Sequence, residues 1–212
     1  MPLQKLETLL ARHGHFHCLP YTSESHATEK TVPFRHSATP PADVDVPDIG
    51  RLREFYRAFG SLAFYHCGDD DAARYLAAPH EWPAYREEFD IWIADIDSDE
   101  WADIAPAELL HEDESGHVDL RALVIGNTPH SGNYILMADN GAVYEFDHDG
   151  FEFYPIAPDI ITYAETLLAP DAKALRDYTT FLGLRDAGDT CPYYVAAVHF
   201  ADGEVFNLSD EE

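Results

Sequence analysis

The stretch that decides the fold runs from Leu123 to Leu168 and reads LVIGNTPHSGNYILMADNGAVYEFDHDGFEFYPIAPDIITYAETLL. Asn140-Gly141 lies between two apolar runs, and both residues tolerate positive φ, so the sequence predicts a tight hairpin there. Four short runs are rich in β-branched and aromatic residues, as strands are: 123–126, 134–138, 143–147 and 151–154. Three or four antiparallel strands follow from this pattern.

The end of this stretch changes to a helical period. Pro155 and Pro158 are expected to close the last strand, because proline cannot donate to a ladder. Asp159 is a good N-cap, and apolar residues then recur at the i, i+3, i+4 and i+7 positions from Ile160. The sequence therefore predicts a helix over 160–168 that packs on the sheet.

Other segments carry shorter patterns. Leu52, Phe55, Tyr56 and Phe59 predict a helix over 51–59, which Gly60 would end. The first residues predict a short helix, followed by an irregular or extended piece and a linker. The remaining predictions are a strand at 61–68, a helix at 71–76, a strand at 89–96, a helix from Pro170 to Leu182, and a terminal hairpin of 193–200 with 204–208.

At these residues the chain resembles the SUKH superfamily, an immunity-protein fold that also includes a yeast regulator of cell-wall assembly. Residues 61–122 are longer and more acidic than this family implies, and the first 45 residues have no counterpart in it. The matching segments are Val46–Asp48 leading into Leu52–Gly60, Ile125–Asn127 to Ser131–Tyr134, Val143–Asp149, and Ala157–Leu168. They are mostly apolar and turn-forming, so they indicate a fold and not a site.

The expected architecture is α+β, a single domain whose mainly antiparallel, twisted sheet is flanked by helices. At 212 residues with 46% hydrophobic content, the chain can bury one substantial core. We expect residues 1–45 to form an N-terminal extension and linker, and residues 46–212 to form the SUKH-like domain. The sequence does not indicate an oligomeric state.

The charge balance restricts the classes of molecule that the protein is expected to bind. Forty acidic against 13 basic residues give a net charge of −27, and no basic run is present, so nucleic-acid binding is not expected. A cationic protein is the complementary partner, because opposite charges steer association. The alternative is that the acidity only keeps the protein soluble.

The sequence also bears on the cellular compartment and on contact with membranes. No stretch approaches the roughly 20 apolar residues of a membrane span, and no signal-peptide pattern begins the chain, so a cytoplasmic protein without membrane contact is expected. Cys18, Cys67 and Cys191 are odd in number and widely spaced, which fits a reducing compartment and argues against a disulfide framework.

Metal binding has one candidate segment. His13, His15 and His17 alternate, so they would share one face of an extended segment, and Cys18 adds a possible thiolate. Structural zinc sites usually draw on two separated ligand pairs, and no second pair has the expected spacing, so a polar strand without metal is the preferred interpretation.

Two acidic segments begin like calcium-binding loops but lack residues that such loops require. The segment from Asp95 has Glu100 where the turn needs glycine and Pro106 where a bidentate glutamate belongs. Residues 147–150 lack the following ligands and are better explained as a hairpin turn. We therefore predict no metal and no cofactor.

No catalytic class is indicated. Cys67, His66 and Asp69 supply the residue types of a nucleophile triad, but catalytic partners usually converge from distant segments. The chain has no nucleophile elbow, and the glycines of 126–132 lack phosphate-binding and dinucleotide spacings. We expect a protein that is not an enzyme and has no catalytic residues.

Residues 81–103 contain all three tryptophans of the chain, Trp82, Trp92 and Trp101, among many carboxylates. Aromatic anchors ringed by acidic residues suit a surface that binds a basic partner, whereas Trp92 alone is expected in the core. The predicted contact residues are Asp95, Asp97, Asp99, Glu100, Trp101 and Asp103.

The preferred function is that of a non-catalytic immunity protein. The resemblance implies a toxin partner, and the charge favours a basic toxin domain, such as a nuclease, whose active-site face would be occluded. The alternative is an intracellular regulatory or scaffold module that binds another protein through the same fold. A metal protein or enzyme based on the N-terminal histidines is the third hypothesis.

Overall fold

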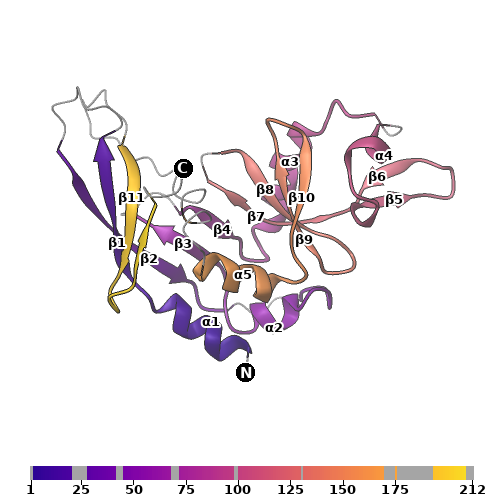
Figure 1. Cartoon of the computed structure of the whole chain (residues 1–212). Coiled ribbons are helices and arrows are strands. Elements are labelled where there is room, and N and C mark those ends of the chain that lie inside the picture. The colour runs from indigo at the N-terminus through magenta and orange to yellow at the C-terminus, as the bar shows by residue number, and fades with distance from the viewer. Residues whose placement is uncertain are drawn as a thin grey trace. The chain divides into compact units, whose positions relative to one another are not determined.

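The computed structural model describes residues 2–20, 28–41, 45–67, 72–97, 100–129, 131–169, 175 and 193–208. Its helices are α1 (Pro2–Leu10), α2 (Leu52–Tyr56), α3 (Trp82–Trp92), α4 (Trp101–Ile104), α5 (Ile160–Leu168) and the 3₁₀ helix Ala107–Leu109 (Figure 1). Its strands are β1 (Gly14–Pro20), β2 (Lys30–Ala38), β3 (Leu62–His66), β4 (Arg74–Leu76), β5 (Leu110–Glu112), β6 (Val118–Leu120), β7 (Leu123–Thr128), β8 (Asn133–Met137), β9 (Val143–Asp147), β10 (Glu152–Ala157), β11 (Tyr193–Phe200) and β12 (Val205–Asn207). The predicted α+β class with mainly antiparallel pairing is confirmed.

The chain divides into two compact units. The first unit contains Met1–Ser37, Ala63–Arg74 and Glu165–Glu212, and the second contains Ala38–Leu62 and Tyr75–Ala164. The first unit therefore draws on both ends of the chain. Among the described residues, no helix combines the length and the apolar character needed to cross a bilayer.

The second unit contains the strand order β10-β9-β8-β7-β4. The predicted Asn140-Gly141 hairpin is confirmed: Met137 pairs with Val143, and the Asn140 side chain accepts a 2.9 Å hydrogen bond from the backbone N–H of Ala142. Gly141 has φ +90°, a conformation that favours glycine. The predicted turn at 147–150 joins β9 to β10.

The predicted end of β10 is confirmed at Pro158 but not at Pro155. The strand continues through Pro155 to Ala157 and pairs with β9, with a register shift between these two residues. β10 is the outermost strand of this order. A proline in an edge strand, next to a bulge, removes few hydrogen bonds between strands.

Two predicted elements have the wrong type. Residues 89–96 do not form a strand, because they lie at the end of helix α3 and in the turn after it. Trp82, Tyr85 and Phe89 recur at helical spacing and face the core, and Pro83 lies in the first turn, where its missing N–H costs nothing. The helix predicted at 71–76 is also wrong, because Arg74–Leu76 form strand β4.

β4 and β7 approach closely because β7 has a glycine at the point where the two strands pair. Leu76 pairs with Gly126, and a Cβ added to Gly126 would lie 2.0 Å from the backbone oxygen of Tyr75. Helix α3 packs on β7 (Figure 1), and Phe89 is fully buried against Tyr134 and Phe146.

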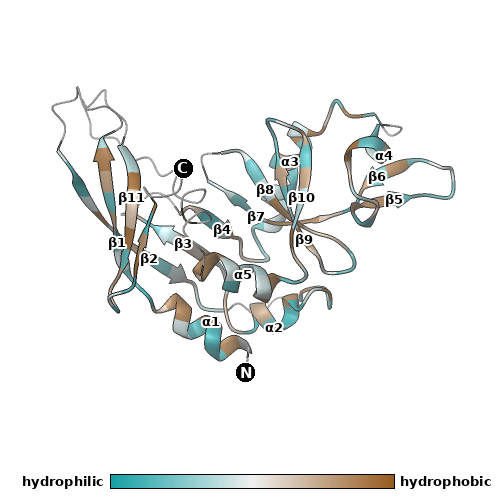
Figure 2. Ribbon diagram, viewed as in Figure 1, coloured by the Kyte–Doolittle hydropathy of each residue, from teal (hydrophilic) through white to brown (hydrophobic). Residues whose placement is uncertain are grey.

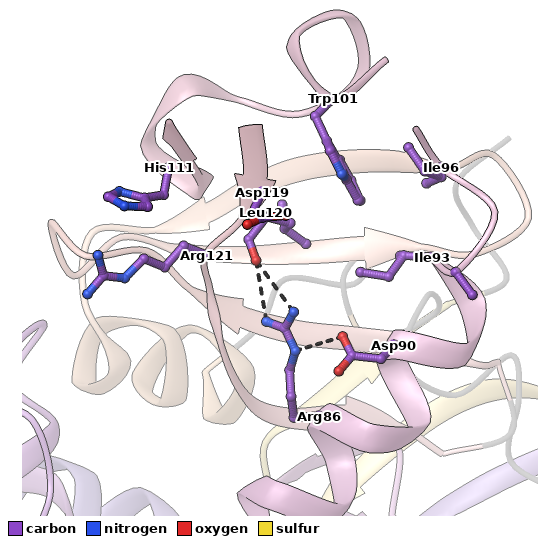
Figure 3. A pocket seen from close by; sticks show the side chains of 10 residues that line it. Arg86, Asp90, Ile93, Ile96, Trp101, His111, Asp119, Leu120 and Arg121 are labelled. Atoms are coloured by element: carbon purple, nitrogen blue, oxygen red, sulfur yellow. Dashed lines mark hydrogen bonds and ion pairs between the residues drawn. The ribbon is translucent and has the colours of Figure 1, made fainter. Parts of the chain in front are cut away.

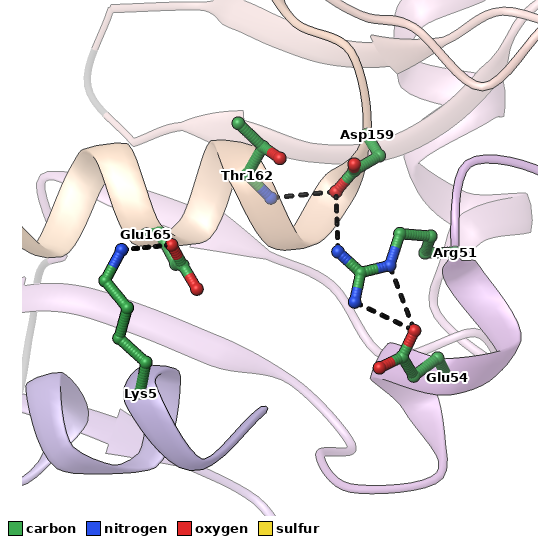
Figure 4. A network of polar contacts seen from close by, with 6 residues as sticks. All are labelled: Lys5, Arg51, Glu54, Asp159, Thr162 and Glu165. Carbon is green, nitrogen blue, oxygen red and sulfur yellow. Dashed lines mark hydrogen bonds and ion pairs between the residues drawn. The ribbon is translucent and has the colours of Figure 1, made fainter. Parts of the chain in front are cut away.

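The predicted helix from 51 is shorter than expected, but the helix from 160 is confirmed. α2 ends at Tyr56, and α5 begins after Asp159, whose carboxylate accepts a 2.8 Å hydrogen bond from the backbone N–H of Thr162 as the predicted N-cap (Figure 4). In the second unit Arg51 also pairs with Glu54 at 2.9 Å and with Asp159 at 3.7 Å.

In the first unit, strands follow the order β3-β2-β1-β11-β12, so residues of the predicted extension are integrated into a sheet with the C-terminal strands. The predicted strand at 61–68 and the terminal hairpin are confirmed as β3 and β11–β12. The predicted helix from Pro170 lies outside the described residues, apart from Leu175. Helix α1 carries both hydrophilic and hydrophobic residues (Figure 2), and Leu6 and Leu10 are buried. Lys5 on this helix pairs with Glu165 (Figure 4).

A buried histidine lies in the aromatic core of the first unit. His36 is 5% exposed, and its Nδ1 accepts a 3.2 Å hydrogen bond from the backbone N–H of Tyr65. Burial, with smaller contributions from His13 and Arg12, lowers the pKa of His36 from 6.5 to about 3. The imidazole is therefore neutral in the folded protein at pH 7.

This shift makes the stability of the first unit dependent on pH. The unfolded state binds a proton at His36 below pH 6.5 and the folded state does not, so stability is lost as pH falls from 6.5 towards 3. We expect a loss of about 2 kcal/mol between pH 7 and pH 5 that His36→Phe does not show, although this variant is less stable at pH 7 because the N–H of Tyr65 loses its acceptor. Urea unfolding followed by far-UV circular dichroism at both pH values measures the difference, and equal losses in the two proteins would contradict it.

Candidate protein-binding surface

Helix α3 ends in two exposed apolar side chains. Ile91 is 74% exposed and Trp92 is 42% exposed, whereas Phe89 on the same helix is fully buried. The helical period explains this split, because Ile91 lies about 200° around the axis from Phe89. The expectation that Trp92 belongs to a core strand is therefore wrong. Large exposed apolar side chains that adjoin one another are typical of binding surfaces.

Carboxylates surround this apolar pair in the sequence and remain exposed in the structure. Glu87, Glu88 and Asp90 lie on α3 itself. Asp95 and Asp97 follow in the turn after the helix. Here the term acidic surface means the exposed residues Glu87, Glu88, Asp90, Ile91, Trp92, Asp95, Asp97, Glu100 and Asp103. The predicted contact residues Asp95, Asp97, Glu100 and Asp103 all belong to it, whereas Asp99 lies outside the described residues.

Trp101 does not belong to the acidic surface. It is 5% exposed and packs in the core of the second unit, with its ring centroid 6.5 Å from that of Phe153. The first turn of the short helix α4 directs the indole inwards. The prediction that Trp101 is an exposed anchor is therefore corrected, and Trp92 with Ile91 supplies the exposed apolar area.

Glu100 shapes the turn between α3 and α4. Its carboxylate accepts a 3.2 Å hydrogen bond from the backbone N–H of Asp97, and the backbone N–H of Glu100 donates to the carbonyl of Asp97 at 2.9 Å. This pair of contacts closes the turn and holds both exposed side chains on one loop.

A pocket of about 480 Å³ lies between the end of α3, α4 and the β5–β6 hairpin (Figure 3). Ile93, Ile96 and Trp101 give it an apolar wall, and His111 and Arg121 give it a polar one. The pocket suits an apolar or aromatic side chain entering from a partner.

Arg86 fixes one edge of this pocket. Its Nε donates to Asp90 at 2.8 Å, and its guanidinium donates to the carbonyl oxygen of Leu120 at 3.4 Å (Figure 3). The guanidinium also donates to the carbonyl oxygen of Ala122 at 3.1 Å. These bonds tie helix α3 to the chain between β6 and β7. The guanidinium is thus engaged within the unit, and the surface around α3 remains acidic.

The candidate catalytic and calcium residues form no known site among the described residues. Cys67 Sγ lies 3.8 Å from the carbonyl oxygen of Tyr65, and Asp69 lies outside the described residues. Asp147, His148 and Asp149 bring their ligand atoms within 4.8 Å of one another, but they are consecutive residues of the hairpin turn, and His148 Nδ1 is engaged with Asn133 Oδ1 at 3.1 Å.

The first unit contains a second polar group, the three N-terminal histidines. They lie on or beside β1 as predicted for a polar strand, and Cys18 faces the opposite, buried side. Burial raises the pKa of the Cys18 thiol to about 11, so this group is a neutral thiol at pH 7 and not a thiolate ligand.

Comparisons with protein-family models, with curated proteins and with solved structures find no match for this chain.

Proposed function

We propose that this protein is a non-catalytic binding protein that occludes a basic protein partner with the acidic surface. The observation that carries the proposal is the pair Ile91 and Trp92, which are exposed at the end of α3 among carboxylates. Apolar and aromatic anchors supply most of the affinity of protein interfaces, and a buried tryptophan contributes about 2 kcal/mol or more at such positions.

The carboxylates have a separate role in this proposal. Their field, added to the net charge of −27, would steer a cationic partner to the surface and raise the association rate. They would also pair with lysine and arginine side chains around the apolar contact. Occlusion would then be steric, with the partner's basic face covered and no bond made or broken.

The resemblance to SUKH immunity proteins makes a toxin domain the partner class that we propose, with a nuclease as the type whose substrate-binding face is basic. Both proteins would meet in the cytoplasm. The regulatory module remains a competing function, and it differs from the immunity proposal in the identity of the partner.

A charge-reversal variant tests the surface. We expect the chain, used as bait in its native host, to recover a basic protein that Asp95→Lys/Asp97→Lys/Glu100→Lys recovers at least about tenfold less, because the long-range attraction and the rim pairs are lost. Quantitative mass spectrometry of the captured proteins at low salt measures this ratio, and recovery should fall as salt rises.

The control carries the same change of charge elsewhere. Glu7→Lys/Asp45→Lys/Glu114→Lys reverses three exposed carboxylates outside the acidic surface and should retain the partner. Equal loss in both triple variants would show that net charge alone acts and would remove the proposed surface. Recovery of housekeeping proteins alone by the wild-type chain would favour the regulatory module.

A further inference from the structure

Three histidines from the two ends of the chain meet on one face of the first unit. β1 and β11 are antiparallel, and His15 pairs directly with His199. Their rings are stacked, with centroids 4.7 Å apart and an interplanar angle of 12°. His17 is two residues further along β1, on the same face, and its ring centroid is 6.5 Å from that of His199.

A carboxylate adjoins this group. Glu29 immediately precedes β2, which pairs with β1, and its Oε2 lies 3.7 Å from Nε2 of His17. A carboxylate next to a metal-bound histidine commonly accepts the N–H of the ring nitrogen that does not bind the metal. At 3.7 Å Glu29 makes no hydrogen bond to His17, so it would have to move closer to take this role.

We propose that His15, His17 and His199 form a binding site for a divalent zinc ion that joins β1 to β11. Two histidines separated by one residue on a strand, with a third on the neighbouring strand, place three imidazoles side by side on one face of the sheet. Zinc accepts three histidine ligands in a tetrahedral arrangement whose fourth position holds water. Imidazole ligands favour zinc over magnesium and calcium, which prefer oxygen.

Binding requires a change in ring orientation. The rings of His15 and His199 are stacked nearly parallel, so the two rings must turn about the Cβ–Cγ bond to converge on one ion. This torsion has broad, shallow wells in histidine. The ion would replace the stacked contact with two coordinate bonds, and His17 would complete the site.

Neighbouring candidates are excluded by position. Cys18 lies on the buried face of β1. His13 is beyond the paired region, where its carbonyl accepts a hydrogen bond from the N–H of Ala201 and no ligand side chain is opposite. The site thus consists of three imidazoles with Glu29 as the positioning carboxylate.

The test uses the full chain without an affinity tag, freed of metal by chelator dialysis. Isothermal titration with Zn²⁺ should show one ion per chain, and Co²⁺ should give the strong visible absorption of a tetrahedral site. His199→Gln should weaken Zn²⁺ binding by more than about 100-fold, and Glu29→Gln should weaken it by about 10-fold, because losing a ligand costs more than losing its positioning partner.

Two further histidine variants make the result specific. His111→Gln, on β5 of the second unit, should leave Zn²⁺ affinity unchanged, and so should His148→Gln. Thermal unfolding of metal-free proteins checks that each variant folds, and Zn²⁺ should raise the midpoint of the wild type but not of His199→Gln. Unchanged affinity in His199→Gln, or loss of binding in His148→Gln, would overturn the proposed site.

Discussion

Phe89→Ala is expected to lower the free energy of unfolding of the second unit by about 3–5 kcal/mol, the usual cost of removing a fully buried phenylalanine. The Phe89 ring is inaccessible to solvent, with centroids 5.4 Å from the ring of Tyr134 and 5.2 Å from that of Phe146. Its loss leaves a cavity between α3 and the sheet. Urea unfolding followed by tryptophan fluorescence reports this unit, because all three tryptophans belong to it.

Ile91→Ala is the matched control on the same helix. Ile91 is 74% exposed, so its truncation should change the free energy of unfolding by no more than about 0.5 kcal/mol. A strand over 89–96 would place both residues on one face, and both variants would then be similarly costly. Similar losses in the two variants would therefore contradict the helix and support the strand.

Gly141→Ala is expected to cost about 2–5 kcal/mol in the same unfolding measurement. Gly141 has φ +90°, which disfavours any residue with a Cβ, and the added Cβ would lie 2.5 Å from the Cα of Gly50. The Cα of Gly50 is a backbone atom and the added Cβ is held rigidly by the backbone of residue 141, so neither can move away by a side-chain rotation.

Gly116→Ala separates the cost of the positive φ from the cost of the steric clash with Gly50. Gly116 has a similar φ of +85°, but a Cβ there would meet only the end of the Glu112 side chain at 3.9 Å. Its variant should cost only the conformational part, about 1–2 kcal/mol. Equal losses in Gly116→Ala and Gly141→Ala would show that the close approach of Gly50 and Gly141 has no energetic effect.

The hairpins of the second unit could be predicted because their signals are local. Asn140-Gly141 specifies a turn through backbone conformations that few residues adopt, and the flanking runs alternate with the period of a strand. Asp159 similarly marks the start of α5 by its capping side chain. Each of these signals lies within about five residues of the structure that it determines.

Helix α3 was not predicted because its last turn mimics a strand. Phe89, Ile91 and Ile93 alternate with less apolar residues, which favoured a strand over 89–96. The signals for the helix lay earlier, in Pro83 at its first turn and in the i, i+4 pair of Arg86 with Asp90. This local misassignment also reversed the expected places of Trp92 and Trp101.

The histidine group illustrates what a sequence without structure does not provide. His15 and His17 were recognised as sharing one face, but the third imidazole, His199, comes from β11 near the other end of the chain. Pairing between strands so distant in sequence is set by tertiary packing, for which no local pattern exists. Zinc-finger spacing predicts a second ligand pair close in sequence, whereas the structure places a single histidine from a neighbouring strand beside the first two.

Site-specific photo-crosslinking from Ile91 tests the central claim most directly. A photoreactive phenylalanine analogue at Ile91 should link the chain, in its native host, to one basic protein, and the same analogue at Val205, which is 45% exposed in the first unit, should not. A cross-link to the same protein from Val205 with none from Ile91 would contradict the account and would remove the acidic surface from the proposed function.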